Sequence, residues 1–240
     1  MNDYWRDHYN ANAERFPQSP LRQVERTVDG NEMSQAQLDL AINAVIQALG
    51  LRCSDRVVDL CCGNGLITKV IARQVEKVVA VDFSEKLVDY ARKFNWSQNI
   101  EYIVSDVTKL PSKFYEASNK IYIRDSISCL DTEGFSNLLR LIGSNSNFEK
   151  LYIAGVPDAD RLTIYYNTDE KMAFYRQREA ARMPHIGRWW SEGEIKTLVE
   201  ALGLKVSCFA QNSELASAYY RFDCLIEKRD ATSLSGSEVR

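Results

Sequence analysis

The sequence predicts an α/β protein built on a doubly wound, mostly parallel sheet with helices on both faces. Apolar runs typical of strands alternate with helix-like segments between residues 57 and 155. Parallel strands need such helical crossovers, because a short turn cannot return the chain to the same end of the sheet. Two further strand-like runs, at 204–209 and 219–228, lie close together in sequence and predict an antiparallel hairpin. We therefore expect seven strands.

The first strand leads directly into a glycine turn. Residues 57–68, VVDLCCGNGLIT, read as a buried strand, a turn and the start of a helix, with Asp59 inside the strand. Gly63 and Gly65 allow the backbone to turn sharply and to present its N–H groups to a ligand. The dinucleotide fingerprint G-x-G-x-x-G is absent. Taken alone, the turn also fits an ordinary connection between a strand and a helix.

Two more strands end in an acidic residue. The run 78–81 is followed by Asp82, and the run 101–104 is followed after one residue by Asp106. Ligands of open α/β sheets bind outside the carboxyl ends of the strands, so these acids and the glycine turn share one edge. Asp82 is placed there to accept hydrogen bonds from both hydroxyls of a ribose.

The other elements follow from apolar periodicity and capping residues. Ser84 predicts the start of a helix that extends to about residue 94, and residues 191–194, SEGE, form a capping box for the last helix. Gly203 fits the cap at the end of that helix. The remaining predictions are helices at 66–74 and 135–142 and strands at 121–123 and 151–155.

The pattern D-x-C-x-G-x-G, formed by Asp59, Cys61, Gly63 and Gly65, resembles motif I of the class I S-adenosylmethionine-dependent methyltransferases. That motif is usually (D/E)-x-G-x-G-x-G, so Cys61 stands where the family has its first glycine. The resemblance covers about residues 40–228. It implies that S-adenosylmethionine (SAM) is the cofactor and that the last strand lies between its neighbours in the sheet.

The resemblance also implies which residues bind the cofactor. Asp82 would bind the ribose, its neighbour Phe83 would pack on the adenine, and Asp106 would bind the adenine amino group. Arg22 would pair with the carboxylate of the cofactor, although it would equally fit a packing role. The complete expected set is Asp59, Cys61, Gly63, Asn64, Gly65, Asp82, Phe83, Asp106, Val107, Arg124 and Arg22.

Two segments lie outside the minimal fold and are expected to hold the substrate. Residues 1–35 predict an N-terminal helical cap, and residues 157–190 predict a lid inserted into the cofactor-binding domain at 36–228. A disordered tail is expected at 229–240. The lid is too long for an ordinary connection between a strand and a helix. The expected substrate residues are Tyr4, Trp5, Tyr165, Tyr166, Arg188 and Trp189.

The expected function is transfer of a methyl group from SAM to a hydroxyl of a small molecule by in-line displacement. His185 is the candidate general base, although it could instead bond the lid backbone near Pro184. Three alternatives remain open. They are a metal-assisted O-methyltransferase with Asp125 and Asp158 as Mg²⁺ ligands, a nicotinamide-dependent oxidoreductase, and a non-catalytic SAM-binding protein.

The composition of the chain narrows the classes of partner that we expect. The 240 residues carry a formal net charge of −3, which gives no electrostatic footprint for nucleic acid, so we expect no nucleic-acid partner. No apolar run has transmembrane length, so we expect no membrane partner. The six cysteines form no C-x-x-C pair, so no metal ligand is assigned. These features predict a reduced, cytoplasmic protein, and they leave its oligomeric state open.

Overall fold

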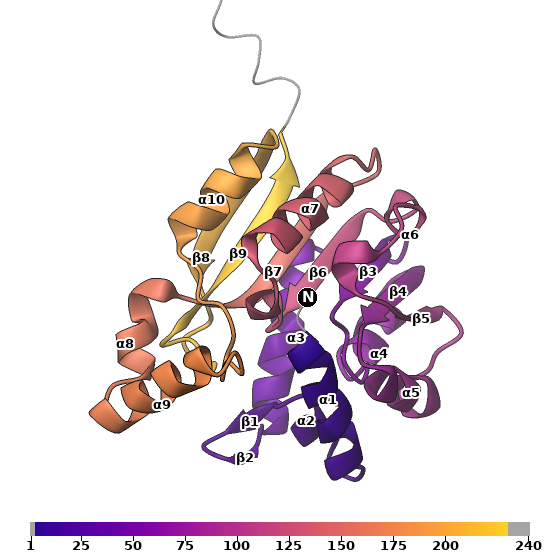
Figure 1. The fold of residues 1–240 in the computed structure, drawn as a ribbon. Helices are drawn as coiled ribbons and strands as arrows, with labels where there is room; N and C mark the ends of the chain where they lie inside the picture. The colour runs from indigo at the N-terminus through magenta and orange to yellow at the C-terminus, as the bar shows by residue number, and fades with distance from the viewer. Residues whose placement is uncertain (1–2, 230–240) are drawn as a thin grey trace, which may run out of the picture.

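The structure is a computed structural model that describes residues 3–229, and its centre is a seven-stranded sheet (Figure 1). The strand order is β5-β4-β3-β6-β7-β9-β8. The first five strands of this order are parallel, whereas β9 runs antiparallel to β7 on one side and to β8 on the other. The strands are β3 (Arg56–Leu60), β4 (Lys77–Asp82), β5 (Ile100–Val104), β6 (Lys120–Arg124), β7 (Lys150–Pro157), β8 (Leu204–Ala210) and β9 (Arg221–Lys228). The predicted fold is confirmed, including the insertion of the last strand between its neighbours.

Helices cover both faces of the sheet. Strand side chains alternate between the faces, so Ile121 and Ile123 of β6 pack into one apolar core and Tyr122 packs into the other. One face carries α3 (Gln35–Leu49), α4 (Thr68–Ile71) and α5 (Glu85–Phe94), and the other carries α6 (Lys113–Glu116), α7 (Thr132–Gly143) and α10 (Glu192–Glu200). Each face therefore has its own apolar core.

The predicted helix starts are present at two serines. The Ser84 hydroxyl accepts a hydrogen bond from the Leu87 amide at 3.2 Å, and the Ser191 hydroxyl accepts one from the Glu194 amide at 3.1 Å. The helix predicted at 66–74 is shorter than expected. It consists of α4 followed by a 3₁₀ turn, η1 (Ala72–Gln74), because the glycine turn extends as far as the start of α4. The other 3₁₀ turns are η2 (Val107–Lys109), η3 (Ile127–Cys129) and η4 (Ala159–Arg161).

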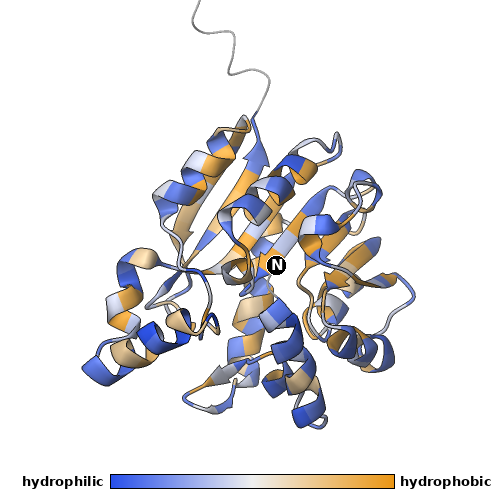
Figure 2. Ribbon diagram, in the orientation of Figure 1, coloured by the Kyte–Doolittle hydropathy of each residue, from blue (hydrophilic) through white to orange (hydrophobic). Residues whose placement is uncertain are grey.

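The N-terminal segment packs beside the carboxyl ends of the strands (Figure 1). It comprises α1 (Asp3–Arg15), α2 (Pro20–Gln23) and a small hairpin of β1 (Thr27–Val28) and β2 (Asn31–Glu32). Figure 2 shows α1 as mostly hydrophilic, and Trp5 is its buried residue. The Asn10 side chain accepts a hydrogen bond from the Ser84 hydroxyl at 2.8 Å. This contact ties α1 to the segment that follows β4.

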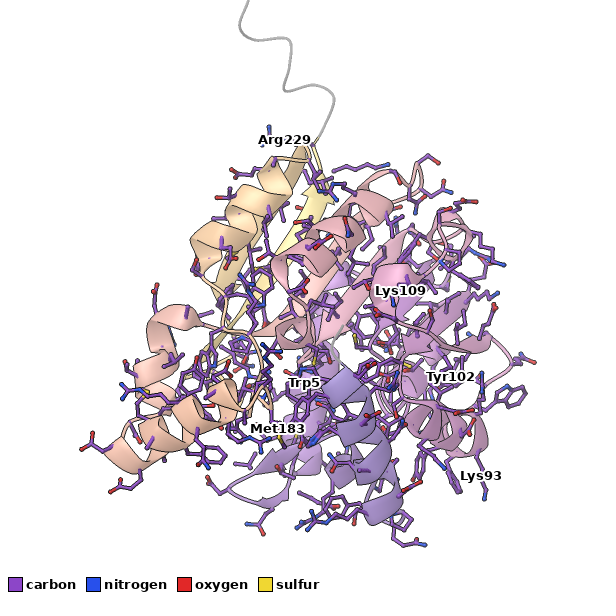
Figure 3. The ribbon with its side chains drawn as sticks, viewed as in Figure 1. Trp5, Lys93, Tyr102, Lys109, Met183 and Arg229 are labelled. Atoms are coloured by element: carbon purple, nitrogen blue, oxygen red, sulfur yellow. The ribbon has the colours of Figure 1, made fainter. Side chains whose placement is uncertain are left out.

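The segment between β7 and α10, predicted to be a lid, contains short helices. It contains η4, α8 (Leu162–Tyr165) and α9 (Asp169–Ala180). The Tyr4 hydroxyl joins this segment to α1, because it donates a hydrogen bond to the Pro184 carbonyl at 3.3 Å and accepts one from Arg178 at 2.7 Å. Figure 3 shows the side chains around this junction and labels Trp5 and Met183. Helix α1 and the lid thus form one cover over the edge of the sheet.

The sequence predicts a C-terminal tail and no membrane span. Apart from Arg229, the predicted tail at 229–240 lies outside the described residues. Within residues 3–229, none of the helices combines the length and the apolar character that a bilayer span requires.

Candidate cofactor and acceptor site

A cavity lies at the carboxyl ends of β3, β4 and β6, at the edge where the sequence places the ligand. Its walls also include Tyr9 of α1 and Arg26, which follows α2. Seven of the eleven residues predicted to bind the cofactor line it, namely Asp59, Cys61, Gly63, Asn64, Asp82, Phe83 and Arg124. The site is therefore built from the sheet edge and is covered by the N-terminal segment.

The glycine turn adopts the left-handed backbone conformation that its sequence suggests. Gly63 and Gly65 have φ of +56° and +76°, and Cys61 has φ of +61°. A non-glycine residue with such a φ costs roughly 1 kcal/mol, which explains why glycine suits this position. At Gly65 the restriction is also spatial, because an added Cβ would approach the Tyr102 hydroxyl to 2.4 Å. Cys61 occupies its position with some strain.

Asp82 joins the turn to the next helix. One carboxylate oxygen accepts a hydrogen bond from the Gly63 amide at 2.8 Å, and the other accepts one from the Ser84 amide at 2.9 Å. Burial raises the pKa of this carboxyl to about 6, although the amide hydrogen bonds act against the shift. Asp82 is thus held rigidly against the cavity as an acceptor for donors from a ligand.

Asp59 is a second buried acid of the cavity. It accepts hydrogen bonds from the hydroxyls of Thr68, at 2.6 Å, and Tyr122. Burial is the main reason that the pKa of Asp59 rises to about 6, and the nearby charge of Asp82 adds to the rise. Two carboxyls with raised pKa values therefore face one cavity, which favours a cationic ligand.

We expect the affinity for SAM to fall as the pH drops below 6. The positively charged sulfonium favours the ionised forms of Asp59 and Asp82, so each acid must lose any bound proton when the cofactor binds. From pH 7.5 to pH 5 the dissociation constant should rise roughly 100-fold, since one pH unit below a pKa costs a factor of about 10 for each of the two acids. Calorimetry in two buffers of different ionisation enthalpy measures both the affinity and the proton release. An affinity that is constant between pH 5 and pH 7.5 would contradict this prediction.

The expected adenine end is only partly assembled from the predicted residues. Phe83 lines the cavity, and its ring centroid lies 6.4 Å from that of Tyr9. Asp106 is not a lining residue, and its carboxylate accepts hydrogen bonds from the Thr108 amide at 2.9 Å and the Thr108 hydroxyl at 2.7 Å. Val107 is fully buried in the core. Tyr9 is a cavity residue that sequence reasoning missed.

Arg22 lies outside the cavity, whereas Arg26 lines it. The Arg22 guanidinium donates a hydrogen bond to the Gly30 carbonyl at 3.2 Å and lies 5.9 Å from the Phe16 ring centroid. Arg26, which follows the end of α2, lines the cavity together with Arg124. No local sequence signal separates the two N-terminal arginines, because only tertiary packing selects Arg26.

Asp125 is surrounded by three arginines beside the cavity. Its carboxylate lies 3.0 Å from Nη1 of Arg26, 3.1 Å from Nη1 of Arg221 and 3.3 Å from Nε of Arg124. Burial alone would raise the pKa of Asp125, but these positive charges outweigh it and lower the pKa to about 2. Gly155 makes room for this carboxylate, because an added Cβ would stand 2.0 Å from it.

These contacts bear on the proposed Mg²⁺ ligands. The Asp125 oxygens face guanidinium groups, and Asp158 forms an ion pair with Arg161 at 3.3 Å. Among the residues in the described range, no group of three or more His, Cys, Asp or Glu side chains is arranged to hold a metal ion. Because Asp125 and Asp158 already pair with guanidinium groups, these two acids do not fit a divalent cation.

The predicted lid residues gather in an aromatic cluster. The Tyr165 ring centroid lies 4.5 Å from that of Tyr220 and 5.8 Å from that of Trp189. Tyr166 packs against Tyr175 at 4.8 Å. Arg188 instead pairs with Glu194 and stacks over the Trp190 ring at 4.2 Å. The predicted substrate residues Tyr4, Trp5, Tyr165, Tyr166, Arg188 and Trp189 are absent from the cavity wall itself.

His185 belongs to the same lid and does not line the cavity. Its Nδ1 lies 3.2 Å from the Tyr166 hydroxyl, and its ring centroid lies 5.3 Å from that of Phe174. Burial lowers the pKa of His185, although the charge of Glu25 acts against the shift. The imidazole is therefore neutral at pH 7, the form that a general base requires.

Comparisons with known proteins agree with this geometry. Residues 57–143 match a family described as a methyltransferase domain. Magnesium protoporphyrin IX methyltransferase from Synechocystis PCC 6803, solved with bound SAM, is 14% identical with a TM-score of 0.63, covering 95% of this chain and 98% of that one. The DhpI–SAM–HEP complex is 15% identical with a TM-score of 0.62, covering 95% and 97%. A TehB-like SAM-dependent methyltransferase from Corynebacterium glutamicum is 17% identical with a TM-score of 0.58, covering 93% and 99%.

Curated relatives correct one prediction. The chain is 32% identical over 88 residues to 23S rRNA (uracil(1939)-C(5))-methyltransferase RlmD from Bordetella pertussis, and 33% identical over 96 residues to RlmD from Psychromonas ingrahamii. The two matches cover 37% and 39% of this chain. They span only 19% and 20% of the length of the respective relatives. Because these relatives act on RNA, the exclusion of nucleic acid that rested on net charge is wrong.

Proposed function

We propose that this chain, a class I SAM-dependent methyltransferase by its fold and its methyltransferase domain, methylates an oxygen atom of a small molecule held between the cavity and the lid. The observation that carries the proposal is the fixed position of Asp82. Its carboxylate closes the glycine turn onto α5 at the strand ends while still facing the cavity.

The residues that line the cavity offer partners for several groups of SAM. Asp82 would accept hydrogen bonds from the ribose hydroxyls, and Phe83 with Tyr9 would enclose the adenine. Arg26 and Arg124, which also line the cavity, would receive the carboxylate. When bound, SAM supplies an electrophilic methyl group on a sulfonium. The protein then has to align an acceptor oxygen with that methyl group and to exclude water.

Alignment is the main catalytic task that we assign to the protein. Fixing two reactants in line can contribute roughly 7–11 kcal/mol to the lowering of a reaction barrier. The cover formed by α1 and the lid supports this role, since the Tyr4 hydroxyl bonds both the Pro184 carbonyl and Arg178. A small acceptor is further supported by magnesium protoporphyrin IX methyltransferase, a structural neighbour of nearly the same extent that is named for a small molecule.

RNA methylation is the second candidate, and the curated relatives favour it. Incubation of the protein with methyl-tritiated SAM and a cell extract separated into small molecules and RNA distinguishes the two. We expect the label in the small-molecule fraction. Label recovered in RNA would replace the proposal with the second candidate. A protein that shows no binding of SAM or S-adenosylhomocysteine (SAH) by calorimetry would contradict both.

We expect His185→Ala to lower turnover roughly 100-fold if the acceptor is a hydroxyl, because general-base catalysis typically contributes 10²–10⁴-fold. SAM affinity should stay nearly unchanged, since His185 does not line the cavity. His185→Gln is the matched control, because an amide can still hydrogen-bond the Tyr166 hydroxyl but cannot accept a proton at pH 7. If His185→Gln restores turnover, His185 has only a structural role. The wild-type rate should rise with pH to a plateau above the lowered pKa.

A further inference from the structure

We infer that the acceptor carries an oxyanion, a carboxylate or a phosphonate-type group, and that Arg221 binds it next to the lid. This inference rests on the proposed function and names the class of its substrate. Arg221 is the first residue of β9 and pairs in register with Pro157, the last residue of β7, where the lid begins. It therefore stands where the sheet edge, the cavity and the lid meet.

The arginines around Asp125 outnumber the carboxylates that they contact directly. Three guanidinium groups share this one carboxylate, at 3.0, 3.1 and 3.3 Å. The neighbouring acids have partners of their own. Asp223 accepts hydrogen bonds from the Gly155 amide and from Gln211, both at 2.8 Å, and Glu25 pairs with His8 at 2.7 Å. Asp125 is therefore the carboxylate that these three guanidinium groups contact.

Arg221 also has an unused hydrogen-bond donor. In the described part of the chain, its Nε is buried and lacks a hydrogen-bond partner. The Arg221 side chain is only 13% exposed. An unsatisfied buried donor costs roughly 1–3 kcal/mol, more when it is charged. A guanidinium offers its donors in a planar fork that matches an oxyanion, so a bound oxyanion would remove this cost.

The three arginines around Asp125 differ in their position relative to the cavity. Arg26 and Arg124 line the cofactor cavity, whereas Arg221 does not. The Arg221 guanidinium lies 5.1 Å from the ring centroid of Tyr220. Its Nη1 lies 3.1 Å from the carboxylate of Asp125, which does line the cavity. Arg221 is thus separated from the cavity by Asp125, on the side where we place the acceptor.

The aromatic residues of the lid indicate what the rest of the acceptor molecule is like. Tyr165 packs against Tyr220 at 4.5 Å and against Tyr219 at 6.3 Å, so aromatic rings stand beside the Arg221 guanidinium. Aromatic walls with a cation at their base suit a compact apolar body that ends in an oxyanion. Such a group would be anchored by Arg221 while a nearby oxygen receives the methyl group.

The test uses simple probes of this chemistry on the SAH-saturated protein. Benzoate and phenylphosphonate are the anionic probes, and benzamide is the neutral probe of the same shape. Calorimetry should show that both anions bind at least tenfold more tightly than benzamide. Equal binding of benzoate and benzamide would overturn the inference. Binding of SAH is measured first, so its absence would instead refute the proposed function.

Arg221→Gln is the decisive variant. We expect it to weaken both anions at least tenfold and to change the SAH dissociation constant less than twofold. Arg161→Gln is the matched control, because Arg161 bonds the carbonyls of Ala218 and Tyr219 just before Arg221 but is 41% exposed and pairs with Asp158. Its anion binding should equal that of the wild type. Anion binding that survives Arg221→Gln would overturn the inference.

Arg221 also donates a hydrogen bond to the Gly155 carbonyl at 2.8 Å, so Arg221→Gln could impair folding. Arg221→Lys is the second test variant in that case. Lysine keeps the charge but lacks the fork. We expect several-fold weaker binding of phenylphosphonate than in the wild type. Wild-type affinity in Arg221→Lys would show that the fork has no role and would overturn the inference.

Discussion

Asp82→Ala is expected to weaken SAM binding by about 10³-fold, because two charge-assisted hydrogen bonds to the ribose contribute roughly 1.5–3 kcal/mol each. The same change removes the acceptor for the Gly63 and Ser84 amides, which lie 2.8 and 2.9 Å from it. The turn then loses its link to α5. Calorimetry with SAM and with SAH measures the loss directly.

Two comparison variants separate the ribose contact from the role of Asp82 in the turn. Asp82→Asn keeps one acceptor oxygen for an amide but removes the charge, so we expect an intermediate loss. Asp89→Ala removes an exposed acid from α5 and should leave affinity unchanged, since its side chain is 60% exposed and lies outside the cavity. If Asp82→Ala binds SAM as tightly as the wild type does, the assignment of Asp82 to the ribose is refuted.

Asp125→Asn is expected to lower the free energy of unfolding by roughly 3 kcal/mol at pH 7, because removing one partner of a buried ion pair typically costs 3–5 kcal/mol. The lower end applies, since the Asp125 side chain is 30% exposed. In the variant, Arg26, Arg124 and Arg221 would face each other without a carboxylate between them. Urea denaturation of both proteins gives the difference.

The pH dependence of this difference has a definite sign. The pKa of Asp125 is about 2 in the folded protein and 3.8 ordinarily, so the carboxyl stabilises the fold above pH 3.8 and loses this effect as the pH falls through 2. The gap between wild type and variant should therefore close toward pH 2. Asp158→Asn is the control, because Asp158 pairs with one arginine instead of three. An equal loss of stability in both variants would contradict the role of the cluster.

The sequence was sufficient for the sheet and for the cofactor edge. Strand ends at Asp59 and Asp82 and the glycine turn are local patterns, and local patterns fix which residues meet at one edge of a parallel sheet. The capping box at residues 191–194 and the closing hairpin were also local. Such features depend on neighbours within a few residues.

The rest of the site depends on contacts between distant segments. Asp125 meets Arg26 from the N-terminal segment and Arg221 from β9, and no spacing in the sequence links these three residues. The choice of Arg22 over Arg26 was equally undetermined, because both lie in one short segment. Net charge failed as a guide to partners, because a sum over 240 residues does not say how the charges are distributed.

The raised pKa values of Asp59 and Asp82 show where binding strength and folding stability oppose each other. Both acids have pKa values of about 6, above the ordinary 3.8, so the fold is most stable when they are protonated and loses stability as the pH rises through 6. At neutral pH the ligand-free protein therefore keeps two poorly solvated negative charges side by side. Replacing both acids with neutral residues would raise the stability of the ligand-free domain. It would also weaken the binding of SAM, since the same charges attract the sulfonium.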